Sequence, residues 1–110
     1  MVAEKVFLVQ QKYLQIWGYR MLKAEYSTIF KKDIKRIKKR NLDLKILTKV
    51  MDDLINQVSL DSKYKDHSLI GNYVNHRECH LKPDWLLIYY YYKNDTIVFY
   101  RTGTHSDLFD

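Results

Sequence analysis

The C-terminal part of the chain, residues 73–101, reads YVNHRECHLKPDWLLIYYYYKNDTIVFYR and decides the fold class. Its middle, residues 85–92, is almost wholly apolar and aromatic, which is typical of a central strand buried on both faces. A Pro-Asp pair before it indicates a turn, and an Asn-Asp pair after it indicates a hairpin. The sequence therefore predicts three successive strands, at residues 73–81, 85–92 and 96–101.

The segment before these strands predicts one more strand, at residues 22–26, and two helices. Apolar residues at helical spacing follow Ser27 or Thr28, either of which can cap the first helix, and a second helix opens at Asp43. Residues 59–71 show no clear period and predict a loop. The order strand, helix, helix and three strands predicts an α+β domain, with two helices packed on one face of a mostly antiparallel sheet.

Charge is concentrated in the helical segment. The chain has a net charge of +6, and residues 27–49 hold nine Lys or Arg and two Asp, while residues 50–110 hold six Lys or Arg and nine Asp or Glu. A local basic stripe is typical of a protein that binds a polyanion. A solvated helix face that only aids solubility is an equally good reading of the charge alone.

Cysteine usage and the N-terminus bear on the compartment. Cys79 is the only cysteine, so no intrachain disulfide can form, which fits a reducing cytoplasm. The apolar run at residues 6–9 is too short for a secretory signal, and no stretch approaches a membrane-spanning length. We expect a cytoplasmic protein that does not enter a membrane.

Histidines supply the candidate chemistry, and all four, at positions 67, 76, 80 and 105, lie in the strand-rich half. Cleavage of RNA by its own 2′-hydroxyl needs a base, an acid and a cation for the phosphate. Histidine can be acid or base near neutral pH because its unperturbed pKa is about 6.5. The guanidinium of Arg101 offers a fixed fork for phosphate. If the strands bring these segments together, one cleft holds the whole set.

Metal binding is the rival use of the same residues. On a continuous strand His76, Glu78 and His80 would point to one face and could ligate zinc. The chain has no paired Cys motif and no ligand set with recognised zinc spacing. We therefore expect neither a metal nor another cofactor, and we expect Cys79 to be a small buried residue.

Three motifs resemble the toxins of the YafQ type, within the RelE/ParE superfamily. They are YKDHSL at residues 64–69 followed by Gly71-Asn72, RECHLKPDW at 77–85, and RTGTHSDLF at 101–109. The resemblance runs in order through residues 21–110. It implies a RelE-like toxin domain at 21–110 and an N-terminal extension at 1–20. Val6, Val9, Tyr13, Ile16 and Trp17 would line one side of a short helix in that extension.

The resemblance also implies an activity and partners. Such toxins are metal-independent endoribonucleases (mRNA interferases) that cut mRNA in the ribosomal A site, inhibit translation, and are held silent by a DinJ/RelB-like antitoxin. The toxin–antitoxin complex is expected to bind operator DNA through the antitoxin. The basic helix would contact RNA or the ribosome through Lys31, Lys32, Lys35, Arg36, Lys38 and Lys39. Trp85, which lies outside that helix, is expected to contact RNA as well.

The family's active-site positions carry over onto His67, His80, Asp84, His105 and Phe109, with Arg101 close by. We expect His80 with Asp84 as the base and His105 as the acid. His67 and Arg101 would hold the phosphate. Phe109 would stack on a base or fix the C-terminus.

Two alternatives and one departure from the family stay open. A non-enzymatic member of the superfamily, such as a gyrase-targeting toxin or a plain RNA-binding module, would lack this set of histidines. A zinc-dependent hydrolase is weakened by the ligand spacing. The run of four tyrosines at 89–92 departs from the family pattern, and we expect it to pack on the sheet.

Overall fold

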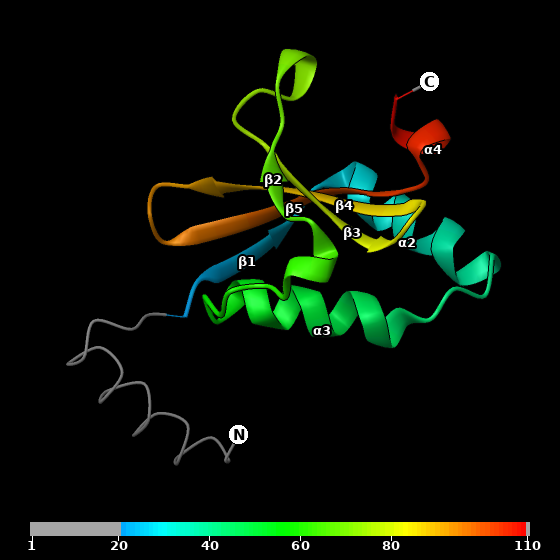
Figure 1. Cartoon of the computed structure of the whole chain (residues 1–110), viewed down its shortest axis with the longest axis horizontal. Helices are drawn as coiled ribbons and strands as arrows, with labels where there is room; N and C mark the ends of the chain where they lie inside the picture. Colours follow the sequence, from blue (N-terminus) through cyan, green and yellow to red (C-terminus); the bar gives the residue numbers. More distant parts are fainter. Residues whose placement is uncertain (1–20, 110) are drawn as a thin grey trace.

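A computed structural model describes residues 21–109 of the chain. The elements follow in the order β1 (Lys23–Tyr26), α2 (Thr28–Lys39), α3 (Leu44–Ile55), η1 (Ser62–Tyr64), β2 (His67–Ser68), η2 (Gly71–Tyr73), β3 (Arg77–Lys82), β4 (Trp85–Tyr92), β5 (Thr96–Gly103) and α4 (His105–Phe109). Figure 1 shows α2 and α3 packed against a central sheet, with α4 at the far end of the chain. This is the predicted α+β arrangement.

The sheet has five strands in the order β1-β5-β4-β3-β2. The neighbours β2–β3, β3–β4 and β4–β5 are antiparallel, which agrees with the predicted mostly antiparallel sheet, whereas β1 pairs with β5 in parallel. The sheet is therefore mixed. β1 pairs with β5 only as far as Phe99, so the last part of β5 is paired with β4 alone.

The two predicted helix starts are confirmed by their caps. The side chain of Ser27 accepts a hydrogen bond from the backbone N of Phe30 at 2.9 Å, and the side chain of Asp43 accepts one from the backbone N of Lys45 at 2.9 Å. Each cap satisfies a backbone donor that the first helical turn leaves without a partner.

Two local predictions differ from the structure, and one helix has no counterpart among the predictions. The strand predicted at residues 73–81 begins only at Arg77, because residues 71–73 form a 3-10 turn and Asn75 has a positive φ of 73°. The loop predicted at residues 59–71 contains the two-residue strand β2. The C-terminal helix α4 carries no periodic pattern in its five residues, and its sequence does not predict it.

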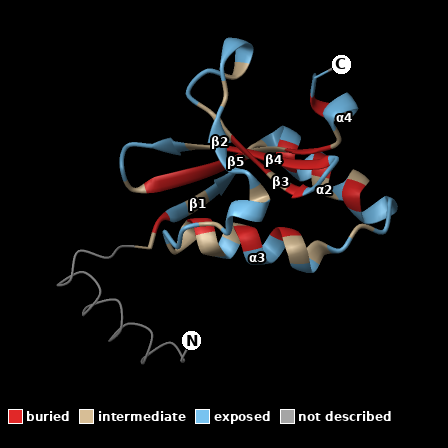
Figure 2. Cartoon of the chain, in the orientation of Figure 1, coloured by how far each residue is buried: buried red, intermediate tan, exposed pale blue. Residues whose placement is uncertain are grey.

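The buried residues form two apolar clusters, one on each face of the sheet. In Figure 2 they concentrate on the central strands, with further ones on α2, α3 and α4. The larger cluster joins α2 and α3 to one face of the sheet, through residues such as Ile37, Val50 and Phe99. The smaller cluster, on the opposite face, holds Leu86, Ile88 and Leu108, the last of which belongs to α4. We call this opposite face the site face. The predicted central strand is confirmed, since β4 contributes buried residues to both clusters.

The tyrosine run divides along β4. Tyr89 is fully buried in the larger cluster, Tyr90 is half-buried, and the side chains of Tyr91 and Tyr92 are about half exposed, at 52% and 51%. Packing on the sheet therefore accounts for the first part of the run but not for its end.

No helix within residues 21–109 is long and apolar enough to cross a membrane. The predicted N-terminal helix, residues 1–20, lies outside the described residues.

Candidate active site

A carboxylate between two imidazoles forms the first half of the site. Pairing of β2 with β3 sets His67 opposite Glu78, and His80 follows Glu78 by two residues, so all three side chains share the site face. Glu78 Oε1 lies 3.3 Å from His67 Nε2 and 3.4 Å from His80 Nε2. The Glu78 side chain is only 7% exposed, so the two imidazoles are its main polar partners.

A second contact between a carboxylate and an imidazole lies at the start of α4. Asp84, in the turn between β3 and β4, lies with its Oδ1 2.6 Å from His105 Nδ1 and 2.9 Å from the backbone N of His105. The hydrogen bond from the His105 backbone, followed by that from its side chain, lowers the pKa of Asp84. Asp84 therefore orients the His105 ring and stays ionised.

Three imidazoles thus lie close together on the site face. The ring centroids of His67 and His80 are 6.1 Å apart, and those of His80 and His105 are 5.9 Å apart. His67 and His80 share the carboxylate of Glu78, whereas His105 contacts that of Asp84. A base and an acid in one reaction can therefore each have a different carboxylate beside them.

The structure pairs the histidines and carboxylates differently from the prediction. His80 has Glu78 beside it, not Asp84, because alternate residues of one strand share a face. Asp84 is instead directed to His105 by the β3–β4 turn. Glu78 is the residue whose role at this site the sequence does not predict, because its contact with His67 depends on the pairing of β2 with β3.

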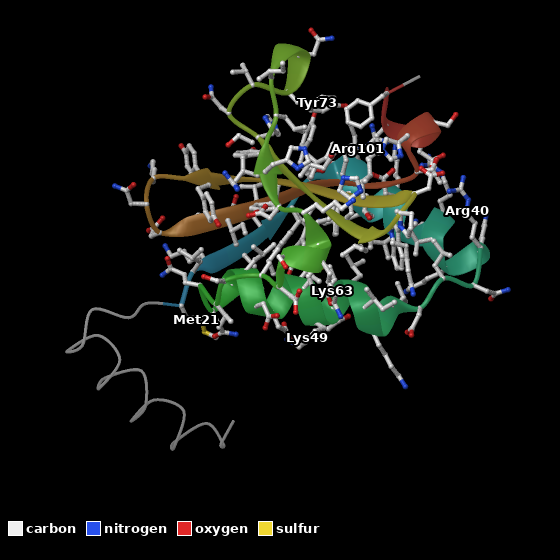
Figure 3. All side chains as sticks on the ribbon, in the orientation of Figure 1. Met21, Arg40, Lys49, Lys63, Tyr73 and Arg101 are labelled. Carbon is white, nitrogen blue, oxygen red and sulfur yellow. The ribbon has the colours of Figure 1, made fainter. Side chains whose placement is uncertain are left out.

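Arg101 is held by a buried carboxylate on α2. Its Nε lies 2.8 Å from Asp33 Oδ2 and its Nη2 lies 3.2 Å from Asp33 Oδ1. The backbone N of Thr102 also donates to Asp33, at 3.0 Å. Asp33 is fully buried, and its hydrogen bond raises the pKa of Arg101. In Figure 3 Arg101 lies over the sheet, close to Tyr73. Any phosphate contact of Arg101 must coexist with this ion pair.

Asp107 fastens α4, and with it His105, to the end of α2. Its carboxylate accepts hydrogen bonds from Arg40 at 2.7 and 3.1 Å and from the backbone N of Thr104 at 2.9 Å. The Arg40 hydrogen bond holds the pKa of Asp107 well below its usual range. A Cβ on Gly103 would lie 2.7 Å from Asp107 Oδ2, so this close approach requires glycine at position 103.

Phe109 closes the site beside an aromatic neighbour. Its ring meets the edge of Tyr73 at a centroid distance of 5.4 Å, and it lies 6.4 Å from the His105 ring. The Tyr73 hydroxyl donates to the backbone O of Leu108 at 3.1 Å, which holds the last turn of α4. Phe109 remains 44% exposed, so one side of its ring is accessible.

The predicted RNA contacts divide into a buried residue, Trp85, and exposed lysines on α2. Trp85 does not offer its ring to RNA: it is 3% exposed in the larger cluster and its Nε1 donates to Thr102 Oγ1 at 3.0 Å. That prediction is wrong, because both faces of β4 are covered. On α2 Arg36 is partly engaged, 3.3 Å from Asp33, whereas the five predicted lysines are exposed: Lys31, Lys32, Lys35, Lys38 and Lys39.

A metal ion could be held by His67, Glu78 and His80. One ligand atom from each lies within 4.8 Å of the others. The zinc ligands considered from the strand pattern included His76 in place of His67. The His76 ring lies elsewhere, 4.8 Å from Tyr90 and 5.0 Å from Tyr100, with its Nδ1 3.2 Å from the backbone O of Val74.

The chain is similar to several known proteins. It is 43% identical over 86 residues to the mRNA interferase toxin YafQ of Escherichia coli K12, which covers 77% of this chain and 92% of that protein. The E. coli DinJ–YafQ toxin–antitoxin complex matches with 41% identity and a TM-score of 0.75, over 82% of this chain and 99% of the matched chain. A metal-bound toxin from Helicobacter pylori matches with 48% identity and a TM-score of 0.76, over 81% of this chain and 100% of that one.

A family model also covers nearly the whole described domain. The model, described as the bacterial toxin of the type II toxin-antitoxin system, YafQ, matches residues 22–110. Because this model matches residues 22–110 and the E. coli toxin is 43% identical, the chain belongs to the YafQ family of type II toxin–antitoxin toxins.

Proposed function

We propose that this chain is a ribosome-dependent endoribonuclease that cuts mRNA in the A site and so inhibits translation. The observation that supports it best is the pair of histidine–carboxylate contacts on one face, Glu78 with His80 and Asp84 with His105. The relative of E. coli K12 is an mRNA interferase, and this chain has on its site face the groups that such a reaction needs.

The proposed reaction uses the RNA's own 2′-hydroxyl as nucleophile. His80, beside Glu78, removes the 2′-hydroxyl proton as the 2′-oxygen bonds to phosphorus. His105, oriented by Asp84, gives a proton to the 5′-oxygen as its bond to phosphorus breaks. The products are a 2′,3′-cyclic phosphate and a 5′-hydroxyl, and no metal is needed. Each positioned acid or base contributes on the order of 10²–10⁴ in rate.

The remaining site residues bind and orient the substrate. His67, when protonated beside Glu78, places a positive charge next to the phosphate during the reaction. Arg101 adds a second cation at a position fixed by Asp33. The accessible side of the Phe109 ring can stack on a base.

The proposed partners follow from charge and from the relatives. The exposed lysines of α2 would bind the phosphate backbone of rRNA, which orients a protein without reading sequence. The homologous toxin was crystallised with the antitoxin DinJ. We propose that this chain likewise has a DinJ/RelB-like antitoxin, which binds it in the cytoplasm and inhibits it. The toxin–antitoxin complex would bind operator DNA through the antitoxin.

The test is cleavage of a defined mRNA on purified ribosomes stalled with that mRNA in the A site. Wild-type protein should cut within the A-site codon, and His80→Gln or His105→Gln should lower the rate at least about 10²-fold. His76→Gln is the matched control, since His76 contacts neither carboxylate of the site. Full activity in both site variants would remove these histidines from the reaction.

A second candidate function is metal binding at His67, Glu78 and His80. Their geometry favours it, and the H. pylori relative is a metal-bound toxin. A metal there would replace the contact of His80 with Glu78 that orients the base, so we expect Zn²⁺ or Cu²⁺ to inhibit cleavage. Calorimetric titration with each metal measures the affinity, and His67→Gln should weaken it. Cleavage that requires the metal and stops in chelator would contradict the metal-free mechanism.

A further inference from the structure

A cavity of about 430 Å³ opens next to the catalytic histidine. It lies between α3, η1 and the β3–β4 turn, and His80 forms part of its wall. Lys63, one of its residues, is labelled in Figure 3 and lies beside α3. This volume is within the range of roughly 300–1,000 Å³ that is typical of sites for small organic groups.

The wall of the cavity combines cations with flat apolar surface. Lys63, Lys65 and Lys82 are exposed on its rim. None of their ammonium groups forms an ion pair with a carboxylate of residues 21–109. Ile46 and Pro83 supply apolar surface. The ammonium of Lys63 lies 5.2 Å from the centroid of the Tyr64 ring, which is also part of the wall. Lysines without a carboxylate partner beside apolar and aromatic side chains suit an anion that carries a flat ring, and a nucleotide has both parts.

We propose that this cavity binds the nucleotide adjacent to the scissile phosphate, with its base against Ile46 and Pro83 and its backbone phosphate at Lys63 and Lys82. The inference rests on the proposed function and specifies how the same site holds its RNA. Because His80 borders both the cavity and Glu78, an occupant of the cavity lies directly beside the reacting group.

The local backbone supports a fixed shape for this subsite. The backbone O of Lys65 lies 2.6 Å from His67 Nδ1, so the segment that carries two of the lysines is tied to a histidine of the site. Lys65 has a positive φ of 51° and the backbone N of Lys63 donates to Asp61 at 2.9 Å, which together define the η1 turn. The cavity is therefore formed by the same turn that positions His67.

An acidic segment of the antitoxin is the other occupant that the charge would suit. The shared His80 wall favours RNA, because a substrate must reach His80 whereas an inhibitor can bind anywhere on the toxin. The two occupants are separated by measuring cleavage and antitoxin affinity on the same variants.

The experiment compares two double variants that remove equal charge. Lys63→Gln/Lys82→Gln alters the cavity, and Lys23→Gln/Lys93→Gln alters the opposite end of the sheet, where β1 begins and the β4–β5 hairpin turns. Both are exposed substitutions that should leave the thermal midpoint unchanged. Kinetics of cleavage of ribosome-bound mRNA should show a loss in kcat/KM of about tenfold per cavity lysine, since 1.4 kcal/mol corresponds to tenfold, and no loss in the control.

A third variant, Ile46→Trp, fills the cavity without changing charge. On a set of mRNAs that differ in the nucleotides flanking the cut, it should change the preference at one flanking position only. Wild-type protein that leaves all ribosome-bound mRNA intact would refute the proposed function itself. Active wild type with cavity variants that match the control in rate and preference would refute the subsite alone, as would cavity variants that cut normally but lose affinity for the antitoxin.

Discussion

The buried carboxylate of Asp33 holds the end of β5 against α2, and its removal is the most informative test of the fold around the site. Asp33 is 0% exposed and accepts from Arg101 at 2.8 and 3.2 Å, from the Thr102 backbone at 3.0 Å and from Arg36 at 3.3 Å. Asp33→Ala leaves the Arg101 guanidinium partly buried with no carboxylate beside it. Breaking such a pair from one side costs about 3–5 kcal/mol.

That loss is a large part of the stability of a small domain, which is roughly 5–15 kcal/mol in total. Urea unfolding, monitored by circular dichroism, should show this loss as a lower midpoint, with an unchanged dependence of the unfolding free energy on urea concentration. The thermal midpoint should fall by at least about 12 °C, at roughly 4 °C or more per kcal/mol for a domain of this size. Thr102, whose backbone N donates to Asp33, lies shortly before His105 in the chain. Loss of the Asp33 carboxylate should therefore also make the position of His105 less ordered.

The control removes an aspartate from an exposed pair. Asp53 contacts Lys49 at 2.6 Å on the surface of α3, and Asp53→Ala should change the midpoint far less because solvent screens that pair. Asp33→Ala/Arg101→Met should regain part of the lost stability, since it leaves no lone charge behind. A loss below about 1 kcal/mol for Asp33→Ala would refute this reasoning.

Three further predictions concern the site, the basic helix and the N-terminus. Glu78→Gln should slow cleavage on the order of 10²-fold while the thermal midpoint stays near wild type, because the imidazoles of His67 and His80 lose their shared carboxylate; a wild-type rate would show that Glu78 plays no part. Replacing Lys31, Lys32 and Lys35 with Gln should weaken ribosome binding and reduce its salt dependence, with codon preference unchanged; a shifted cleavage pattern at equal affinity would show that α2 reads sequence. A chain that starts at Met21 should fold and still arrest growth, since no proposed catalytic residue precedes it; a folded but harmless short form would show that residues 1–20 are part of the functional toxin.

Local signals in the sequence predict much of this fold. Ser27 and Asp43 mark the two helix starts by their own side chains, and the Pro-Asp turn before Trp85 marks the β3–β4 hairpin. These features depend on residues a few positions apart. The parallel pairing of β1 with β5 joins residues about seventy positions apart, and no local pattern carries that information.

The same distinction applies to the site. His67, His80, Asp84 and His105 are identified as site residues by family motifs, but which carboxylate faces which imidazole depends on strand register. The contact of His67 with Glu78 arises from β2, a strand of two residues that is too short to show a period. The burial of Trp85 could not be predicted from the sequence, because an aromatic residue after a turn can face either the core or solvent.

The chemistry of the cut ends tests the central claim most directly, namely that two histidine–carboxylate pairs cleave RNA through its own 2′-hydroxyl. The measurement is mass spectrometry of both fragments from ribosome-bound mRNA, cut by the full chain in the presence of a transition-metal chelator. We predict a 2′,3′-cyclic phosphate, or the 3′-phosphate it hydrolyses to, on one fragment and a 5′-hydroxyl on the other. A 5′-phosphate, or cleavage that stops when the chelator is added, would contradict the account.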